Sequence, residues 1–158
     1  MNKLISSEDL SDKIKSLKKR KKKIVLCHGV FDIIHAGHIS HFKSAKKFGD
    51  ILIISVTSDK FVNKGFNRPM FDLNKRKKIL SELSVVDYVC DSDSKDAISI
   101  IEKIKPNFYC KGPDYKKFND DITNKIKKEI NILKKFGGKF KVTEDQTFSS
   151  SKIINMLN

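Results

Sequence analysis

Residues 24–38 read Ile-Val-Leu-Cys-His-Gly-Val-Phe-Asp-Ile-Ile-His-Ala-Gly-His, and this stretch decides the fold. Its apolar start, residues 24–27, predicts a buried strand, and a helical pattern begins directly after the stretch. His35 and His38 lie at the junction, three residues apart, with Gly37 between them. In an open α/β sheet such a junction holds anionic ligands, because the first backbone N–H groups of the helix are free. The stretch therefore predicts a phosphate site.

The rest of the chain alternates between strand-like and helix-like patterns. Short apolar runs predict strands at residues 24–27, 51–57, 85–90, 107–111 and 139–142. Apolar residues at helical spacing predict helices at residues 8–19, 38–48, 73–83, 95–105, 120–136 and 149–157. Because the two alternate, we expect an α/β fold with one doubly wound, parallel, five-stranded sheet. We expect a basic amphipathic helix within residues 1–23 and a single domain over residues 24–158.

The composition describes an ordinary globular protein. The 158 residues are 39% hydrophobic and 33% charged, and no apolar run approaches the roughly 20 residues that a membrane-spanning helix needs. Residues 1–10 contain acidic side chains and no apolar signal-peptide core, which favours a cytoplasmic location. Cys27, Cys90 and Cys110 lack the spacing of metal ligands and lie in or beside strand-like runs. We expect them to be buried as small hydrophobic side chains.

The formal net charge of +14 raises the question of nucleic-acid binding. Only three of the 33 basic residues are arginines, although arginine makes the two-pronged contacts with bases and phosphates. The densest basic run, residues 18–23, precedes the first strand and is typical of a solvated helix end. The chain also lacks an aromatic RNA-binding signature and a DNA-reading helix. We expect the charge to attract nucleoside triphosphates and phosphorylated substrates.

The turn after the first strand carries side chains suited to phosphate chemistry. Gly29 lets a phosphate approach the backbone, and His35 and His38 share one helix face because they are three residues apart. Each imidazole can donate an N–H to a phosphate oxygen and so stabilise charge on an α-phosphate under attack. A zinc site and a purely structural histidine pair are the alternatives, although no third ligand follows at zinc spacing. We assign no chemistry to His28 or His41.

Residues 29–38, Gly-Val-Phe-Asp-Ile-Ile-His-Ala-Gly-His, resemble the His-x-Gly-His signature of the cytidylyltransferase-like nucleotidyltransferase superfamily. Within it, the chain is similar to glycerol-3-phosphate cytidylyltransferases and to the ADP-heptose synthase (heptose-1-phosphate adenylyltransferase) domain. The resemblance spans residues 24–154, with further matches in order at Thr57-Ser58-Asp59, Arg68-Pro69, Arg76, Val86-Asp87, Lys111-Gly112-Pro113-Asp114-Tyr115 and Ser149-Ser150-Ser151-Lys152-Ile153-Ile154. Such an ordered set is more specific than one histidine motif.

The resemblance implies a Rossmann-like fold and an in-line attack of a phosphate or similar oxyanion on the α-phosphate of a nucleoside triphosphate, from which pyrophosphate leaves. No covalent enzyme intermediate is implied, so catalysis rests on positioning and charge stabilisation. His35 and His38 would contact the triphosphate, with His38 nearest the transition state. Backbone groups of Val30 and Phe31 would contact the nucleotide. Lys64 would meet phosphates of the nucleotide or the acceptor, and its alternative is a plain surface lysine.

The resemblance also assigns residues outside the histidine motif. Arg76 matches a phosphate- or acceptor-facing arginine, and its alternative is a helix-surface ion pair. The loop at residues 111–115 matches one that neighbours the base and the acceptor, where Tyr115 would stack on a ring or pack as part of a lid. The candidate catalytic residues are His35, His38, Lys64 and Arg76. The candidate nucleotide-binding residues are Gly29, Val30, Phe31, Asp32, Gly37, Lys111, Gly112, Asp114, Tyr115, Ser149, Ser150 and Ser151.

The serine run at residues 149–151 precedes the last predicted helix, where hydroxyl groups cap free N–H groups and bind phosphate. The corresponding segment of cytidylyltransferases resembles Arg-Thr-x-Gly-Ile-Ser-Thr-Thr, whereas this chain has Glu144 in place of the arginine. The ADP-heptose synthase version also lacks the arginine. Both CTP and ATP therefore stay open as the nucleotide.

The resulting hypothesis is an enzyme that transfers CMP or AMP to a phosphorylated sugar or polyol and forms an activated precursor for surface glycan synthesis. Mg²⁺ is expected with the triphosphate, bound mainly through phosphate oxygens. The alternatives are a pantetheine-phosphate-type adenylyltransferase and a non-catalytic nucleotide- or nucleic-acid-binding domain. The expected partners are CTP or ATP and the phosphorylated acceptor. A homodimer and a fusion to, or cooperation with, a sugar kinase stay open.

Overall fold

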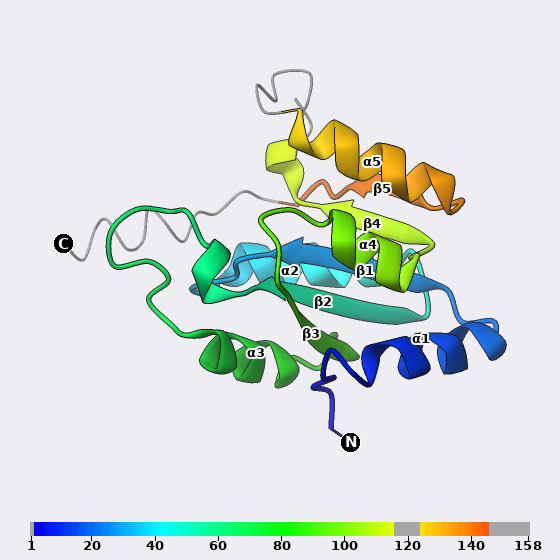
Figure 1. The fold of residues 1–158 in the computed structure, drawn as a ribbon, viewed down its shortest axis with the longest axis horizontal. Coiled ribbons are helices and arrows are strands. Elements are labelled where there is room, and N and C mark those ends of the chain that lie inside the picture. The colour runs from blue at the N-terminus through cyan, green and yellow to red at the C-terminus, as the bar shows by residue number, and fades with distance from the viewer. Residues whose placement is uncertain (1, 116–123, 146–158) are drawn as a thin grey trace.

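Five parallel strands form one sheet in the computed structural model, which describes residues 2–115 and 124–145 (Figure 1). The strands are β1 (Ile24–Gly29), β2 (Ile51–Thr57), β3 (Tyr88–Ser92), β4 (Phe108–Lys111) and β5 (Lys139–Val142). Their order across the sheet is β3-β2-β1-β4-β5, and all four neighbouring pairs are parallel. The predicted α/β fold with a doubly wound, five-stranded parallel sheet is confirmed.

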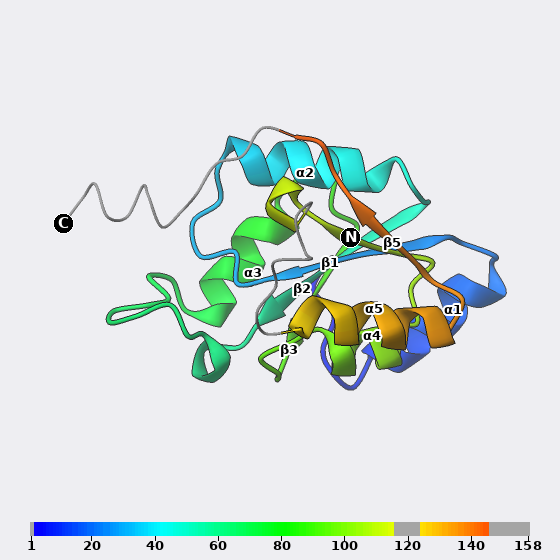
Figure 2. The same cartoon turned by 90° about the horizontal axis from the view of Figure 1, so that it is seen from above.

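Helices cover both faces of the sheet, as the view from above shows (Figure 2). One face packs against α1 (Leu10–Lys19), α4 (Ile98–Ile104) and α5 (Lys125–Lys135). The other face packs against α2 (Ala36–Lys46) and α3 (Leu73–Ser81). Two short 3₁₀ turns, η1 (Asp59–Phe61) and η2 (Pro113–Tyr115), follow β2 and β4. Within the described residues, none of the helices is long and apolar enough to cross a membrane.

The central strand β1 shows why the strand-like runs are continuously apolar. Ile24 and Leu26 belong to the core under α1, α4 and α5, whereas Val25 and Cys27 belong to the core under α2 and α3. Successive side chains of a strand point to opposite faces, so a strand covered on both faces needs apolar residues at every position. The three cysteines are free and buried, as their positions in apolar runs predicted.

The N-terminal segment packs into the same core as the rest of the chain. Leu10, Ile14 and Leu17 of α1 are buried beside α4. Ahead of the helix, the Ile5 N–H donates to the Val89 carbonyl at 2.9 Å, so the start of the chain lies along the β3 edge of the sheet. Helix α1 is therefore amphipathic, and it carries basic residues along its length and in its last turn.

Most predicted elements differ from the observed ones by a few residues at their ends, and two of these differences have a clear local reason. The third strand begins at Tyr88 rather than at residue 85, because the Val86 N–H closes a turn on the Leu83 carbonyl. The fourth helix begins at Ile98 rather than at residue 95, because the Asp96 carboxylate accepts the Ile98 N–H at 3.0 Å and starts the helix there. The predicted last helix, residues 149–157, lies outside the described residues.

The order of the strands determines where a ligand site can form. The chain runs outward from β1 through β2 to β3, then returns to the other side of β1 with β4 and β5. The direction of winding therefore reverses between β1 and β4. In doubly wound sheets, ligands bind in the crevice at the carboxyl ends of the two strands that flank such a switch point.

Candidate active site

The turn that leaves β1 is bent by Phe31, whose φ of 51° lies in the left-handed region. That conformation is unfavourable for a bulky residue and persists because its surroundings hold it. The Phe31 ring packs edge-on against His38 and Phe42, with centroid separations of 5.4 and 5.3 Å. It also covers Gly29, where an added Cβ would stand 3.0 Å from the ring. The turn is therefore clamped onto the first turns of α2.

His35 and His38 lie side by side at the start of α2. His35 occupies the N-cap position, and its carbonyl accepts the His38 N–H at 2.9 Å. Their rings stack with centroids 3.9 Å apart and an interplanar angle of 23°. Both imidazoles thus stand at a helix N-terminus at the carboxyl end of β1, in the arrangement that favours phosphate. Their contact with a triphosphate stays a prediction.

Both imidazoles are neutral at pH 7. Burial, together with the nearby charges of His35, His41 and Lys64, lowers the pKa of His38 to about 3, and burial also lowers the pKa of His35. A neutral imidazole offers one N–H donor and one acceptor nitrogen. The Nδ1 atom of His38 is buried and has no hydrogen-bond partner within the described part of the chain. Any cationic charge near this pair comes from neighbouring side chains such as Lys64.

Asp32 anchors the loop between β2 and α3 to the histidine turn. Its carboxylate is buried and accepts the N–H groups of Met70 at 2.8 Å and Phe71 at 3.1 Å, and Nε of Arg68 at 2.7 Å. Burial alone would raise the pKa of Asp32, but these hydrogen bonds outweigh it and the pKa lies below its ordinary value. The predicted nucleotide-binding Asp32 thus lies under the loop. Sequence reasoning assigned no role to Arg68, although its scarcity as a residue type and the Arg68-Pro69 match were available signals.

Arg76 lies beneath the site, fully buried. Its guanidinium donates hydrogen bonds to the main-chain carbonyls of Val30, of Thr57 at 2.9 Å and of Phe71 at 2.9 Å. It also pairs with the Asp59 carboxylate at 2.6 Å. The expected alternative, an ion pair on the helix surface, does not describe this side chain. Arg76 joins the histidine turn to the end of β2 and to both ends of the loop.

Lys111, the last residue of β4, lies at the switch point between β1 and β4. Its side chain is buried, and Nζ donates to the His28 carbonyl at 2.9 Å. The same ammonium stands 4.9 Å from the centre of the Tyr115 ring, which is partly exposed. An added Cβ at Gly112 would meet no atom within 4 Å, so the backbone here borders open space. Asp114 is exposed beside it. The predicted residues of this loop therefore lie at the same sheet edge as the histidine pair.

A contact that the sequence did not predict attaches the segment after β5 to α2. His41 Nδ1 lies 2.8 Å from Thr143 Oγ1, and Ser44 Oγ donates to the Asp145 carboxylate at 2.8 Å. His41 and Thr143 are 102 residues apart in the chain, so no local sequence pattern predicts their contact. This segment leads toward the predicted serine run 149–151, which lies outside the described residues.

The described residues do not assemble a metal site of their own. No group of three or more His, Cys, Asp or Glu side chains in residues 2–115 and 124–145 is arranged to hold a metal ion. The acidic side chain in the histidine turn, Asp32, is already bonded to Arg68 and to two backbone N–H groups. A divalent ion at this site would therefore depend on oxygen atoms supplied by a substrate.

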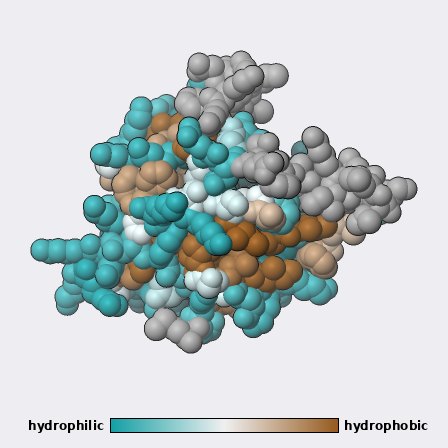
Figure 3. All heavy atoms as spheres, turned by 180° about the vertical axis from the view of Figure 1, so that it is seen from behind, coloured by the Kyte–Doolittle hydropathy of each residue, from teal (hydrophilic) through white to brown (hydrophobic). Residues whose placement is uncertain are grey.

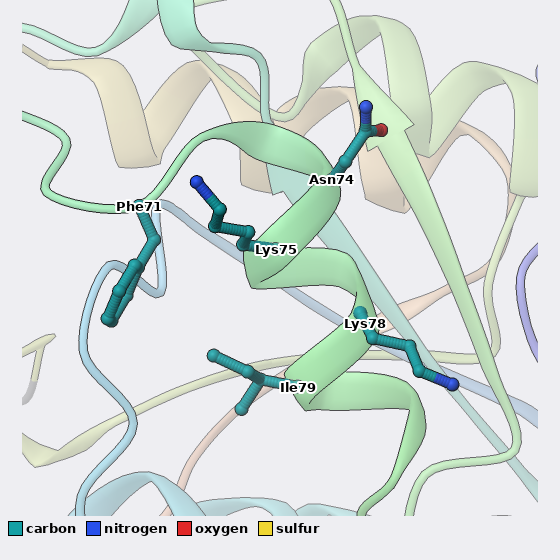
Figure 4. A pocket seen from close by; sticks show the side chains of 5 residues that line it. All are labelled: Phe71, Asn74, Lys75, Lys78 and Ile79. Carbon is teal, nitrogen blue, oxygen red and sulfur yellow. The ribbon is translucent and has the colours of Figure 1, made fainter.

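A separate pocket lies on the outer side of α3. It measures about 360 Å³ and is lined by Phe71, Asn74, Lys75, Lys78 and Ile79 (Figure 4). Seen from behind, the molecule shows an apolar area with hydrophilic side chains to its left and below it (Figure 3). None of the predicted site residues lines the pocket, so it is distinct from the histidine turn.

Known proteins resemble the chain over most of its length. The family model described as cytidylyltransferase-like matches residues 26–156. The chain is 40% identical over 140 residues to the bifunctional protein HldE of Blochmanniella floridana and 38% identical over 140 residues to that of Campylobacter concisus. Each match covers 87% of this chain but only 28% and 29% of the respective relative. The chain thus spans less than a third of the length of these relatives.

Two solved structures also resemble the chain. The lipopolysaccharide core biosynthesis protein from Thermoplasma volcanium has a TM-score of 0.63 and 30% identity, over 81% of this chain and 99% of that one. Pantoate-beta-alanine ligase from Francisella tularensis has a TM-score of 0.58 over 96% of this chain and 73% of that one, but its 21% identity supports the fold alone. With the histidine turn, the parallel sheet and the family match together, the chain belongs to the cytidylyltransferase-like family of nucleotidyltransferases.

Proposed function

We propose that the protein transfers AMP or CMP from a nucleoside triphosphate to the phosphate of a small sugar or polyol phosphate and releases pyrophosphate. The observation that carries this proposal is the pair of stacked, neutral imidazoles of His35 and His38 at the N-terminus of α2. The pair stands at the carboxyl end of β1, beside the switch point, where doubly wound folds bind nucleotides. Membership in the nucleotidyltransferase family supports the class of reaction.

In the proposed reaction, an oxygen of the acceptor phosphate attacks the α-phosphorus, and the bond from that phosphorus to the pyrophosphate oxygen breaks. His38 donates an N–H to an oxygen of the α-phosphate, where negative charge builds, and His35 and the free N–H groups of α2 hold neighbouring oxygens. The donor acts without rearrangement because Phe31 and the stacked ring fix the imidazole of His38. Lys64 supplies positive charge beside it.

Other residues would shape the site around this centre. Gly29, Val30, Phe31 and Gly37 provide backbone next to the nucleotide, and Asp32 and Arg76 hold that backbone in place. The loop at residues 111–115 would border the base or the acceptor. The serine run 149–151, which lies outside the described residues, stays a predicted contact of the triphosphate.

We propose that Mg²⁺ enters with the nucleotide and is bound mainly through phosphate oxygens. The residues fit such a role because Asp32, the carboxylate in the histidine turn, already accepts three hydrogen bonds within the protein. When bound, the ion would neutralise charge on the phosphates and on the leaving pyrophosphate. The protein's own part is to orient the α-phosphate and the acceptor.

Of the two nucleotides we favour ATP, and of the acceptors a sugar phosphate used for lipopolysaccharide. Relatives named HldE at about 40% identity and a structure named as a lipopolysaccharide core biosynthesis protein support this choice, as does Glu144 in place of the cytidylyltransferase arginine. The relatives are named bifunctional and are more than three times as long as the match, which supports cooperation with a second activity such as a sugar kinase.

We place the reaction in the cytoplasm, where buried free cysteines stay reduced. A homodimer stays a prediction, and analytical ultracentrifugation of the purified chain would test it by measuring the oligomeric state.

The test is pyrophosphate release by the purified chain with Mg²⁺ and ATP, CTP, UTP or GTP, each with a panel of sugar and polyol phosphates. Release that requires the acceptor, together with a nucleotide-linked product in the mass spectrum, supports the proposal. The nucleotide with the highest kcat/KM identifies the base. An absence of acceptor-dependent release across the whole panel, with a folded protein, contradicts it.

A further inference from the structure

We propose that Arg68 is a further phosphate-binding residue of this site, which holds a phosphate group of a bound substrate through the Nη2 nitrogen of its guanidinium. The proposal rests on the nucleotidyl transfer proposed above and names a residue for it outside the histidine motif. It follows from how Arg68 is buried, which of its nitrogen atoms is bonded, and which charges surround it.

One edge of the Arg68 guanidinium is fixed by Asp32. The Arg68 side chain is only 7% exposed and the Asp32 side chain 0%, and Nε lies 2.7 Å from the carboxylate. The other carboxylate oxygen accepts the N–H groups of Met70 and Phe71. Asp32 is thus fully engaged, and it orients the planar fork of Arg68 without occupying all of it.

A second nitrogen of the Arg68 guanidinium lacks a partner. Nη2 of Arg68 is buried and forms no hydrogen bond with any described residue. A buried N–H of a charged group that makes no hydrogen bond costs free energy, and a ligand that supplies an acceptor removes this cost. His38 Nδ1, in the neighbouring histidine pair, is another buried polar atom without a partner in the described part of the chain. Arg68 is bonded to Asp32, and Asp32 and His38 belong to the same turn after β1.

The local charge favours an anion as that ligand. Partial burial and the charge of Arg68 lower the pKa of Lys64, whereas the charge of Asp32 raises it. The three charges therefore interact. The charge of Lys64 also lowers the pKa of His38, so the same ammonium acts on the histidine pair and on Arg68. One carboxylate is therefore shared by two cations. A phosphate group would balance the excess positive charge and offer oxygens in the geometry that the guanidinium fork matches.

Phosphate is the shared chemistry of two sources, the triphosphate of the nucleotide and the phosphate of the acceptor. The test separates them with two probes, inorganic tripolyphosphate for the first and glycerol phosphate for the second. Because the chain contains only three arginines, at positions 20, 68 and 76, their side-chain Nε–H signals can be followed individually by NMR in the unmodified protein. Substitutions Arg20→Lys and Arg68→Lys assign them.

The expected result is that the Arg68 signal shifts with tripolyphosphate, with glycerol phosphate or with both, while the Arg20 signal does not move. By calorimetry, Arg68→Gln should weaken binding of the same probe by roughly 10- to 100-fold, the loss typical of a charge-assisted hydrogen bond. Arg20→Gln, on the exposed end of α1, is the matched control. The double variant Asp32→Asn/Arg68→Gln removes both buried charges together and is measured beside the single one.

A saturating concentration of both probes that leaves the Arg68 signal unmoved overturns the proposal, and so does unchanged affinity in a folded Arg68→Gln protein. Failure of the proposed function looks different. A protein whose Arg68 responds to the probes, but which releases no pyrophosphate with any acceptor, would retain the phosphate site and lose the assigned reaction.

Discussion

The guanidinium of Arg76 donates a hydrogen bond from Nη2 to the main-chain carbonyl of Thr57 at 2.9 Å. Thr57 is the last residue of β2, so this bond fastens α3 to the carboxyl edge of the sheet. The same guanidinium reaches the carbonyl of Val30 in the histidine turn. One buried side chain therefore sets the distance between the turn, the sheet edge and the loop that carries Lys64 and Arg68.

Replacing Arg76 with lysine should destabilise the protein although the charge is kept. Lysine offers three donors at one point, which do not reach the four acceptors that the planar guanidinium joins. We expect the free energy of unfolding to fall by about 2–4 kcal/mol, measured by urea denaturation. The exposed Lys78→Ala on the same helix is the control and should change it by less than about 0.5 kcal/mol. Equal stability of the two variants would show that the hydrogen bonds of Arg76 are dispensable.

Removing the imidazole of His38 should act on the chemical step. We expect His38→Ala to lower kcat roughly 100-fold or more, the usual cost of one lost donor to a transition-state oxygen. KM for the acceptor should change far less, because the acceptor is held elsewhere. Steady-state kinetics with the best nucleotide and acceptor measure both. Lys43→Ala, an exposed position on the same helix, serves as control. Near-normal turnover of the His38 variant would remove this residue from the mechanism.

Acidification should destabilise the protein between pH 6.5 and about 4. Burial and nearby histidine and lysine charges lower the pKa of His38 to about 3, and burial with the charge of Lys111 lowers that of His41 to about 4, although Asp145 raises it. Below pH 6.5 the unfolded chain takes up protons on these imidazoles and the folded chain does not, so the free energy of unfolding falls as the pH falls. The upper limit is about 1.4 kcal/mol per pH unit for each histidine. Above about pH 7.5 they contribute almost no slope.

Urea denaturation at pH 7.5, 6 and 5 measures this slope. In His41→Leu the residue no longer titrates, so we expect a shallower dependence on pH over the same window. Ser44→Ala, which breaks the neighbouring contact to Asp145 without removing a titrating group, is the matched control and should keep the slope. A pH dependence identical in wild type and His41→Leu would mean that His41 is not held neutral by the fold.

Sequence patterns predicted the exact bounds of two strands, one almost fully buried and the other at the partly exposed edge of the sheet. Residues 51–57 and 139–142 form strands with the predicted bounds. Strand β2, residues 51–57, is apolar at almost every position because helices cover both faces of the sheet. The pairing of His35 and His38 on one helix face also followed from their spacing alone. The apolar pattern of a strand and the spacing of two histidines both depend on residues that are close together in the chain. A sequence pattern can therefore predict them.

The contacts that the sequence did not predict join distant segments. Asp32 and Arg68 are 36 residues apart, and their ion pair depends on how the loop after η1 returns to the histidine turn. His41 and Thr143 are 102 residues apart and meet only because β5 lies beside β4 and leads its chain toward α2. Arg76 was expected to face phosphate or the acceptor because it matches such an arginine in the family that the chain resembles. Whether a lone arginine faces a ligand or braces the backbone beneath it depends on burial, which a local pattern does not contain.

Lys111 offers the sharpest test of the β4 side of the site. Its buried ammonium donates to the His28 carbonyl at 2.9 Å and lies over the Tyr115 ring, at the switch point where the nucleotide is proposed to bind. Lys111→Met keeps the apolar stem and removes the charge, so we expect affinity for the preferred nucleotide to fall by roughly tenfold or more. Stability should change little, because the cost of burying the ammonium and the gain from its hydrogen bond offset each other. Calorimetric titration with the nucleotide and thermal melting without it measure the two effects. Lys103→Met, exposed on α4, is the matched control for the loss of one positive charge. If both variants weaken binding equally, the charge of Lys111 acts only through the overall field of the protein, and its place at the switch point is incidental.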